Sequence, residues 1–113
     1  MVNKNYVAGR SFEYRIIKWL INRGYYVVRS YASKGVYDLV AVPPKGSRLS
    51  RALLIQAKYS RKNKIKITTE EKIRLGASAN RYQAFSCIAY NENRKLKWKL
   101  VNPYYYVRRK KLY

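Results

Sequence analysis

The sequence contains no histidine and only one cysteine among its 113 residues. The lack of histidine excludes Ser-His-Asp triads, histidine-dependent nuclease motifs and zinc sites with histidine ligands. A single cysteine can form neither an internal disulfide nor a cysteine-rich metal site. Cys87 lies in an apolar run, so we expect it to be a small residue of the core.

Long apolar runs are also missing. No stretch of the chain approaches the roughly 18 apolar residues that a membrane span requires. The N-terminal residues Met-Val-Asn-Lys-Asn lack the apolar core of a secretory signal. We therefore expect no membrane segment and a cytoplasmic protein.

Acidic residues are scarce, with 5 Asp and Glu against 26 Lys and Arg, which gives a formal net charge of +21. Such a charge opposes compaction and favours a polyanionic partner, most commonly nucleic acid. A hydrophobic content of 48% argues against a disordered basic chain. The length suits a single domain over residues 1–113, with a short basic tail from about residue 104.

The apolar pattern predicts the element order αβββαββ. An amphipathic stretch predicts a helix over residues 5–23, capped by Gly24. Thr68 and Glu71 fit a capping box that begins a second helix, which extends to about Tyr82. β-Branched and aromatic residues predict five strands, over residues 25–31, 36–42, 52–59, 84–90 and 94–101. Turn-forming residues predict turns at 43–51 and 91–93.

These elements predict an α/β domain with a central mixed sheet flanked by helices. The strand over 52–59 is an almost continuous apolar run, so we expect it at the centre of the sheet, covered on both faces.

Two of the five acidic residues lack a structural explanation. Glu70 and Glu71 lie in the first turn of a helix, where the helix dipole favours them, and Glu92 lies in a turn. Glu13, however, falls in the middle of an apolar helix face, and Asp38 lies within a strand, where aspartate is disfavoured. A carboxylate in such surroundings has to be neutralised or to bind a cation.

The register of the predicted hairpin brings Asp38 beside other polar residues. If strands 36–42 and 52–58 pair antiparallel about a turn centred on Ser47, Asp38 lies opposite Gln56, and Lys58 shares their face. One interpretation is a buried Asp38–Lys58 ion pair that serves fold specificity. The other is a divalent-cation site for phosphodiester cleavage, in which the lysine stabilises developing charge.

Asp38 followed by Gln56-Ala57-Lys58 resembles the core motif of the PD-(D/E)XK nucleases. The wider pattern over about residues 5–67 resembles the archaeal Holliday junction resolvases, on the segments Gly9-Arg-Ser-Phe-Glu13, Gly24-Tyr-Tyr-Val-Val-Arg-Ser30, Ser33-Lys34 and Tyr37-Asp-Leu-Val-Ala41. The resemblance implies a restriction-endonuclease-like nuclease fold. It also implies a homodimer that cuts four-way DNA junctions by paired symmetric nicks and uses Mg²⁺, with Mn²⁺ as a substitute.

The same resemblance implies roles for individual residues. Metal ligands would be Glu13, Asp38 and Gln56, and the catalytic set would add Lys58 and Ser33. Arg29 matches the arginine that contacts the DNA backbone in the family, and Arg10, Ser30 and Lys34 lie in the segments that carry the resemblance. A basic loop near the site is either a solvated run of charge or a grip on the phosphate backbone, and the net charge favours the grip, by Arg61, Lys62, Lys64 and Lys66. The chain departs from the family at Gln56, which replaces the glutamate of the E-x-K motif. An amide oxygen can still bind a metal, but the missing charge predicts lower affinity.

Other interpretations remain open at the level of the sequence. The chain could be a related metal-dependent nuclease acting on other DNA, or a non-catalytic basic nucleic-acid-binding protein, although a pure binder has no use for buried acids. The 43–51 turn carries basic residues that could contact DNA or be solvated. The stripe formed by Leu96, Trp98 and Leu100 suits a dimer interface or the core equally well. Strand packing explains three tyrosines better than base stacking does: Tyr25, Tyr26 and Tyr31.

Overall fold

The computed structural model describes residues 4–30, 37–61 and 65–101 of the chain. The predicted order αβββαββ is confirmed, with small shifts at the boundaries, by α1 (Lys4–Ile21), β1 (Tyr26–Arg29), β2 (Leu39–Val42), β3 (Leu53–Lys58), α2 (Thr69–Arg81), β4 (Phe85–Glu92) and β5 (Lys95–Val101). Neither helix in these ranges has the length and apolar character of a membrane span. Several predicted features lie outside the described residues, namely Tyr31, Ser33, Lys34, Lys62, Lys64 and the tail from about residue 104.

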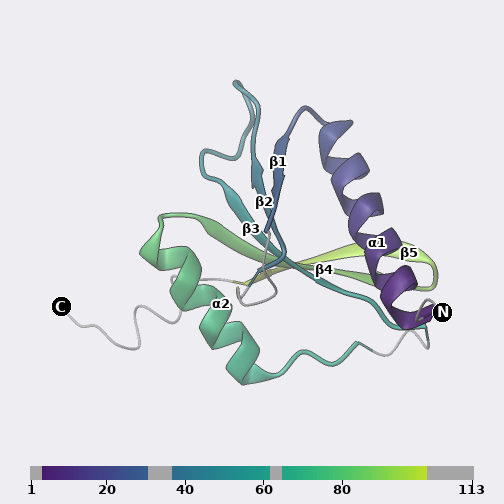
Figure 1. Ribbon diagram of the computed structural model, residues 1–113. Helices are drawn as coiled ribbons and strands as arrows, with labels where there is room; N and C mark the ends of the chain where they lie inside the picture. The colour runs from purple at the N-terminus through teal and green to yellow at the C-terminus, as the bar shows by residue number, and fades with distance from the viewer. Residues whose placement is uncertain (1–3, 31–36, 62–64, 102–113) are drawn as a thin grey trace.

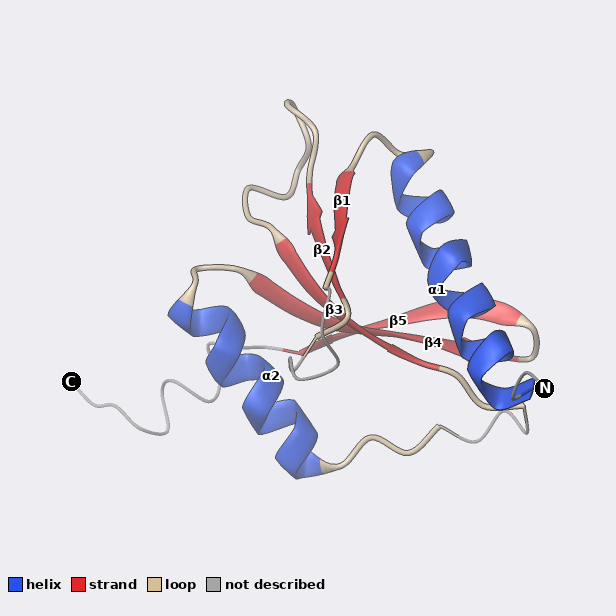
Figure 2. Cartoon of the chain, in the orientation of Figure 1, coloured by secondary structure: helices blue, strands red, loops and turns tan. Residues whose placement is uncertain are grey.

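The strands form one mixed sheet in the order β1-β2-β3-β4-β5, so β3 is the central strand, as predicted. Only the β3–β4 pair is parallel, and α2 forms the crossover that such a pair requires. The two helices lie on opposite sides of the sheet (Figures 1 and 2), which gives the predicted α/β architecture. α1 ends at a turn in which Gly24 takes a φ of +88°, as expected of a capping glycine.

Each helix packs its apolar face on one side of the sheet. On the α1 side, alternate strand residues such as Leu39 and Ile55 meet three helix residues, Phe12, Ile16 and Leu20. On the α2 side, Leu54 packs against Ala79, and Ile88 packs against Leu75. The run Leu53–Leu54–Ile55 is therefore buried on both faces, which explains its nearly continuous apolar character. Cys87 belongs to the α1 side of this core, and burial raises the pKa of its thiol to about 12.

The last hairpin turns later than predicted. β4 continues to Glu92, and a two-residue loop of Asn93 and Arg94, both with positive φ, leads into β5. Asn91 is buried because its side-chain amide donates to the Ser60 carbonyl at 2.7 Å and accepts the Ser60 N–H at 2.8 Å. Its sequence pattern indicates a turn, but the side chain instead binds the backbone after β3.

The members of two predicted groups, the tyrosines of the first strand and the stripe of β5, differ from one another in burial. Tyr25 packs against the α1 side of the core, but Tyr26 is 69% exposed, so the packing prediction is wrong for Tyr26. α2 packs against β4 and β5, and the α2-side surface of β1 is left uncovered. In the β5 stripe, Trp98 packs against the core with its ring centroid 5.2 Å from that of Trp19, whereas Leu100 is 62% exposed.

Candidate active site

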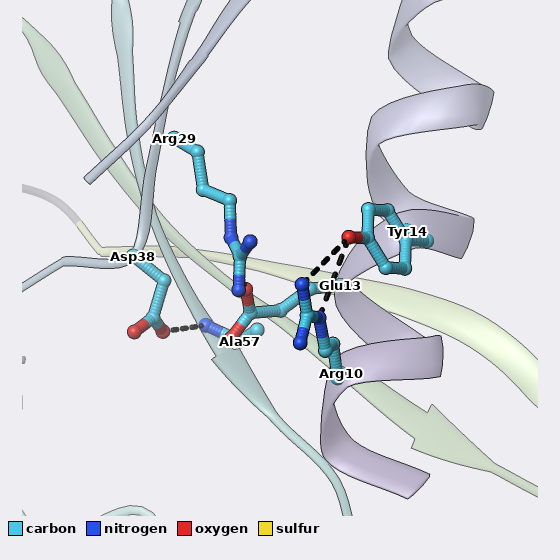
Figure 3. A network of polar contacts seen from close by, with 6 residues as sticks. All are labelled: Arg10, Glu13, Tyr14, Arg29, Asp38 and Ala57. Atoms are coloured by element: carbon cyan, nitrogen blue, oxygen red, sulfur yellow. Dashed lines mark hydrogen bonds and ion pairs between the residues drawn. The ribbon is translucent and has the colours of Figure 1, made fainter. Parts of the chain in front are cut away.

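Asp38 is fixed by the backbone of the neighbouring strands. Leu39 pairs with Ile55 in the predicted register, so Asp38, one residue before β2, lies opposite Gln56. The Asp38 N–H donates to the Ile55 carbonyl at 2.7 Å, and the Asp38 carbonyl accepts the Ser30 N–H at 2.8 Å. The Asp38 carboxylate accepts the Ala57 N–H through Oδ2 at 2.8 Å (Figure 3). The carboxylate thus takes the place of a backbone acceptor at the point where β2 and β3 separate.

Gln56 presents a buried amide oxygen to the same strand face as Asp38. Its Oε1 atom is inaccessible to solvent and has no hydrogen-bond partner among the described residues. Leaving a buried acceptor unpaired costs about 1–3 kcal/mol. An acceptor kept in this state on the strand face next to Asp38 is suited to binding a cation.

Glu13 reaches the same region from α1. Its side chain is 24% exposed, and Oε1 accepts a hydrogen bond from Arg29 Nε at 3.2 Å. Glu13 and Ala57 also line a cavity of about 220 Å³, together with Gly9, Phe12, Tyr59 and Arg61. Ala57 therefore connects the two acids, since its N–H binds Asp38 (Figure 3) and it lines the same cavity as Glu13.

Lys58 is held by a partner that the sequence did not indicate. The Lys58 Nζ forms an ion pair with the carboxylate of Glu71, in the first turn of α2. The interpretation of a buried Asp38–Lys58 ion pair is therefore wrong. The predicted capping box of Thr68 and Glu71 is present, but Glu71 also contacts the candidate site. The hydrogen bond from Lys58 lowers the pKa of Glu71, against an opposing effect of partial burial.

Basic side chains flank Glu13. Arg10 donates through both Nε and Nη2 to the hydroxyl of Tyr14 at 3.3 Å, one helical turn away. The hydrogen bond and charge of Arg10 lower the pKa of Tyr14. Arg29 lies 5.7 Å from the centroid of the Tyr14 ring, so Tyr14 connects the two arginines. Tyr14 was not predicted, although its spacing of four residues from Arg10 was a signal for this contact.

The other predicted DNA contacts that the structure describes are also accessible. Arg61 is exposed and borders the Glu13 cavity, and Lys66 is exposed further along the same loop. Ser30 contributes its backbone N–H to Asp38. The predicted catalytic Ser33 and the DNA-binding residues Lys34, Lys62 and Lys64 lie outside the described residues.

The donor set fits a hard divalent cation such as Mg²⁺, which prefers oxygen ligands. Asp38 offers a carboxylate and Gln56 its unpaired amide oxygen, while Glu13 offers a second carboxylate whose charge Arg29 offsets. In the described ranges, no three Asp, Glu, His or Cys side chains gather as a potential metal site. The fit therefore depends on the Gln56 amide oxygen as the third donor.

Comparison with known proteins bears on the fold and on the family of the chain. A solved structure, the Holliday junction resolvase Hjc of the archaeal hyperthermophile Archaeoglobus fulgidus, matches with a TM-score of 0.62 at 20% identity. The match covers 86% of this chain and 74% of that one, and it confirms the fold. No curated protein sequence matches. The family model described as archaeal Holliday junction resolvase (Hjc) matches residues 4–113. The chain therefore belongs to the archaeal Holliday junction resolvase family.

Proposed function

We propose that this protein is a Mg²⁺-dependent endonuclease that resolves four-way DNA junctions by paired symmetric nicks. The observation that carries the proposal is the buried, unpaired Oε1 of Gln56, a residue that lies opposite Asp38 in the register of β2 and β3, in a chain of this family. The net charge of +21 supports a DNA substrate. We propose that the protein acts in the cytoplasm and as a homodimer.

Each candidate residue has its own role in this reaction. Asp38, Gln56 and Glu13 would hold the cation, which when bound lowers the pKa of a water molecule and offsets charge on the phosphate. Lys58, two residues beyond Gln56 on β3, would stabilise the charge that develops on the phosphate oxygens. Ser33, implied by the family resemblance, would complete the catalytic set.

DNA binding would use the basic side chains around the Glu13 cavity. Arg29 contacts Glu13, Arg10 contacts the adjacent Tyr14, and Arg61 borders the Glu13 cavity. Guanidinium groups suit phosphate oxygens because they donate in a planar fork. We assign the same role to the remaining basic candidates, which are Lys34, Lys62, Lys64 and Lys66. Ser30 would be a further, uncharged contact to the DNA.

A cleavage assay tests the proposal. The substrates are a four-way junction, the matching duplex and the single strands, each labelled in turn on every strand. We expect cleavage of the junction alone, at two symmetry-related positions, with Mg²⁺ or Mn²⁺ and not with excess chelator. Equal cleavage of duplex would instead identify a nuclease for other DNA. Tight binding with no cleavage under any metal would identify a non-catalytic binding protein.

A further inference from the structure

One ion pair ties the end of the central strand to the start of α2. Lys58 is the last residue of β3, and Glu71 lies in the first turn of the helix that crosses over to β4. Both side chains are mostly shielded, with exposures of 23% for Lys58 and 27% for Glu71. Shielding from solvent weakens screening, so this pair holds its geometry better than an exposed ion pair does.

The helix backbone fixes the orientation of Glu71. Its Oε1 accepts the Thr68 N–H at 3.3 Å and the Thr68 hydroxyl at 3.2 Å, and its own N–H donates to that hydroxyl at 3.1 Å. Its Oε2 remains for Lys58. The capping box therefore sets the direction in which Glu71 presents its free oxygen, and that direction is toward Lys58.

The strand itself offers Lys58 no acidic partner. Gln56 is two residues before Lys58 on the same face of β3, but its amide carries no charge. Asp38 is engaged with the Ala57 N–H, and Glu13 with Arg29. A lysine side chain loses substantial rotamer freedom when it is ordered, so a neighbouring carboxylate is needed to hold it. Among the described residues, Glu71 is the acid that pairs with Lys58.

We propose that Glu71 is a positioning residue for Lys58 and replaces, from α2, the carboxylate that Gln56 lacks on β3. This inference rests on the proposed nuclease function, because it assigns Lys58 to the reaction. Glu71 orders the Lys58 ammonium in the protein before DNA binds. It therefore contributes to the rate of cleavage of bound junctions and not to junction affinity.

Glu71→Gln separates this role from helix capping. Glutamine at this position retains the capping box, so the substitution removes the charge and leaves the helix start intact. We expect the single-turnover rate of junction cleavage to fall by about 10–100-fold, the usual effect of losing an outer partner of a site. The junction dissociation constant should stay within about twofold of wild type. The matched control is Glu70→Gln in the same helical turn, where Glu70 is 82% exposed and pairs with Arg74. This control should cleave at the wild-type rate.

A second substitution that places a carboxylate on β3 should restore the cleavage rate lost in Glu71→Gln. In the double variant Gln56→Glu/Glu71→Gln, we expect the rate to return to within about threefold of wild type, since a strand carboxylate again neighbours Lys58. The ordering of Lys58 can also be measured without metal, from the NMR resonance of its ¹⁵N-labelled ammonium group. The variant Lys58→Arg, which lacks this resonance, identifies it. That resonance should be visible in the wild type, lost in Glu71→Gln and present again in the double variant.

Several results would overturn the inference. One is an unchanged rate and Lys58 resonance in Glu71→Gln, and another is failure of the double variant to recover. Thr68→Ala removes the capping box but keeps the charge of Glu71. An equal loss of cleavage rate in that variant would show that Glu71 acts only by capping the helix. If the wild type never cleaves a junction, the proposed function fails, and the ammonium resonance still tests the pairing of Lys58 with Glu71.

Discussion

At the scale of single residues, Asp38 combines a backbone contact with a charge, and one substitution separates the two. Asparagine in its place can still accept the Ala57 N–H through its amide oxygen, so Asp38→Asn should fold as the wild type does. The lost charge weakens cation binding, and we expect cleavage to fall by about 100-fold or more. Junction affinity, measured by gel shift in the same buffer without Mg²⁺, should be unchanged. Cleavage at the wild-type rate would remove Asp38 from the metal site.

Gln56 is the position at which this chain departs from its family, and Gln56→Glu tests its role directly. An added carboxylate attracts the cation, so the Mg²⁺ concentration for half-maximal cleavage should drop. Mutual repulsion among the acids opposes this in the metal-free protein and raises the pKa of one of them, but the divalent charge outweighs it once Mg²⁺ binds.

The measurement for Gln56 is a Mg²⁺ titration of cleavage for the wild type and the variant. Gln83→Glu, an exposed site just beyond α2, adds the same charge away from the site and should leave the Mg²⁺ requirement unchanged. A variant that needs more Mg²⁺, or wild-type cleavage that persists in excess chelator, would show that Gln56 is not a ligand.

At the scale of elements, the Lys58–Glu71 ion pair makes the stability of the contact between β3 and α2 depend on pH. Lys58 lowers the pKa of Glu71 below its ordinary value of 4.5. A carboxyl group with a depressed folded pKa stabilises the fold above its unfolded pKa, and this contribution is lost as the pH falls through the folded value. We expect the wild type to lose more unfolding free energy than Glu71→Gln between about pH 6 and pH 3. Urea unfolding across this range measures the difference, and equal pH slopes for the two proteins would contradict it.

The β2–β3 hairpin could be predicted from sequence because its register depends on local information. A turn rich in Pro, Gly and Ser, centred on Ser47, fixes the pairing of Leu39 with Ile55, and the pairing brings Asp38 opposite Gln56. The capping box at Thr68 was equally local, because its two side chains are three residues apart.

The contacts that escaped prediction join residues distant in the chain. Lys58 meets Glu71 because the crossover returns α2 over β3, and nothing within the capping motif indicates that its acid has a second partner. Asn91 binds Ser60, 31 residues away, so its composition-based assignment to a turn failed. Tyr26 is exposed because α2 does not cover β1, which is a property of how the layers overlap and not of the strand sequence.

At the scale of the whole molecule, the symmetry of the substrate sets the expected assembly. A four-way junction offers two equivalent strands, whereas one chain carries one set of Asp38, Gln56 and Lys58. A two-fold dimer would present two sites related as those strands are. We expect analytical ultracentrifugation to detect a dimer both alone and bound to a junction. Monomer only, under both conditions, would contradict paired nicking by this protein.

The net charge of +21 also governs how the protein holds DNA, and the location of that charge can be tested. Neutralising each phosphate releases counterions, so the logarithm of the junction binding constant should fall steeply with the logarithm of salt concentration.

Arg61 borders the Glu13 cavity, and Arg61→Gln should reduce the magnitude of this slope by about one. Arg81 is the last residue of α2, and β4 begins four residues later at Phe85, which pairs with Leu53 at the opposite end of β3 from Lys58. Arg81→Gln removes the same charge from the molecule and should leave the slope unchanged. If both variants shift the slope equally, binding follows overall charge rather than contacts at the site, and a flat salt dependence in the wild type would contradict electrostatic binding altogether.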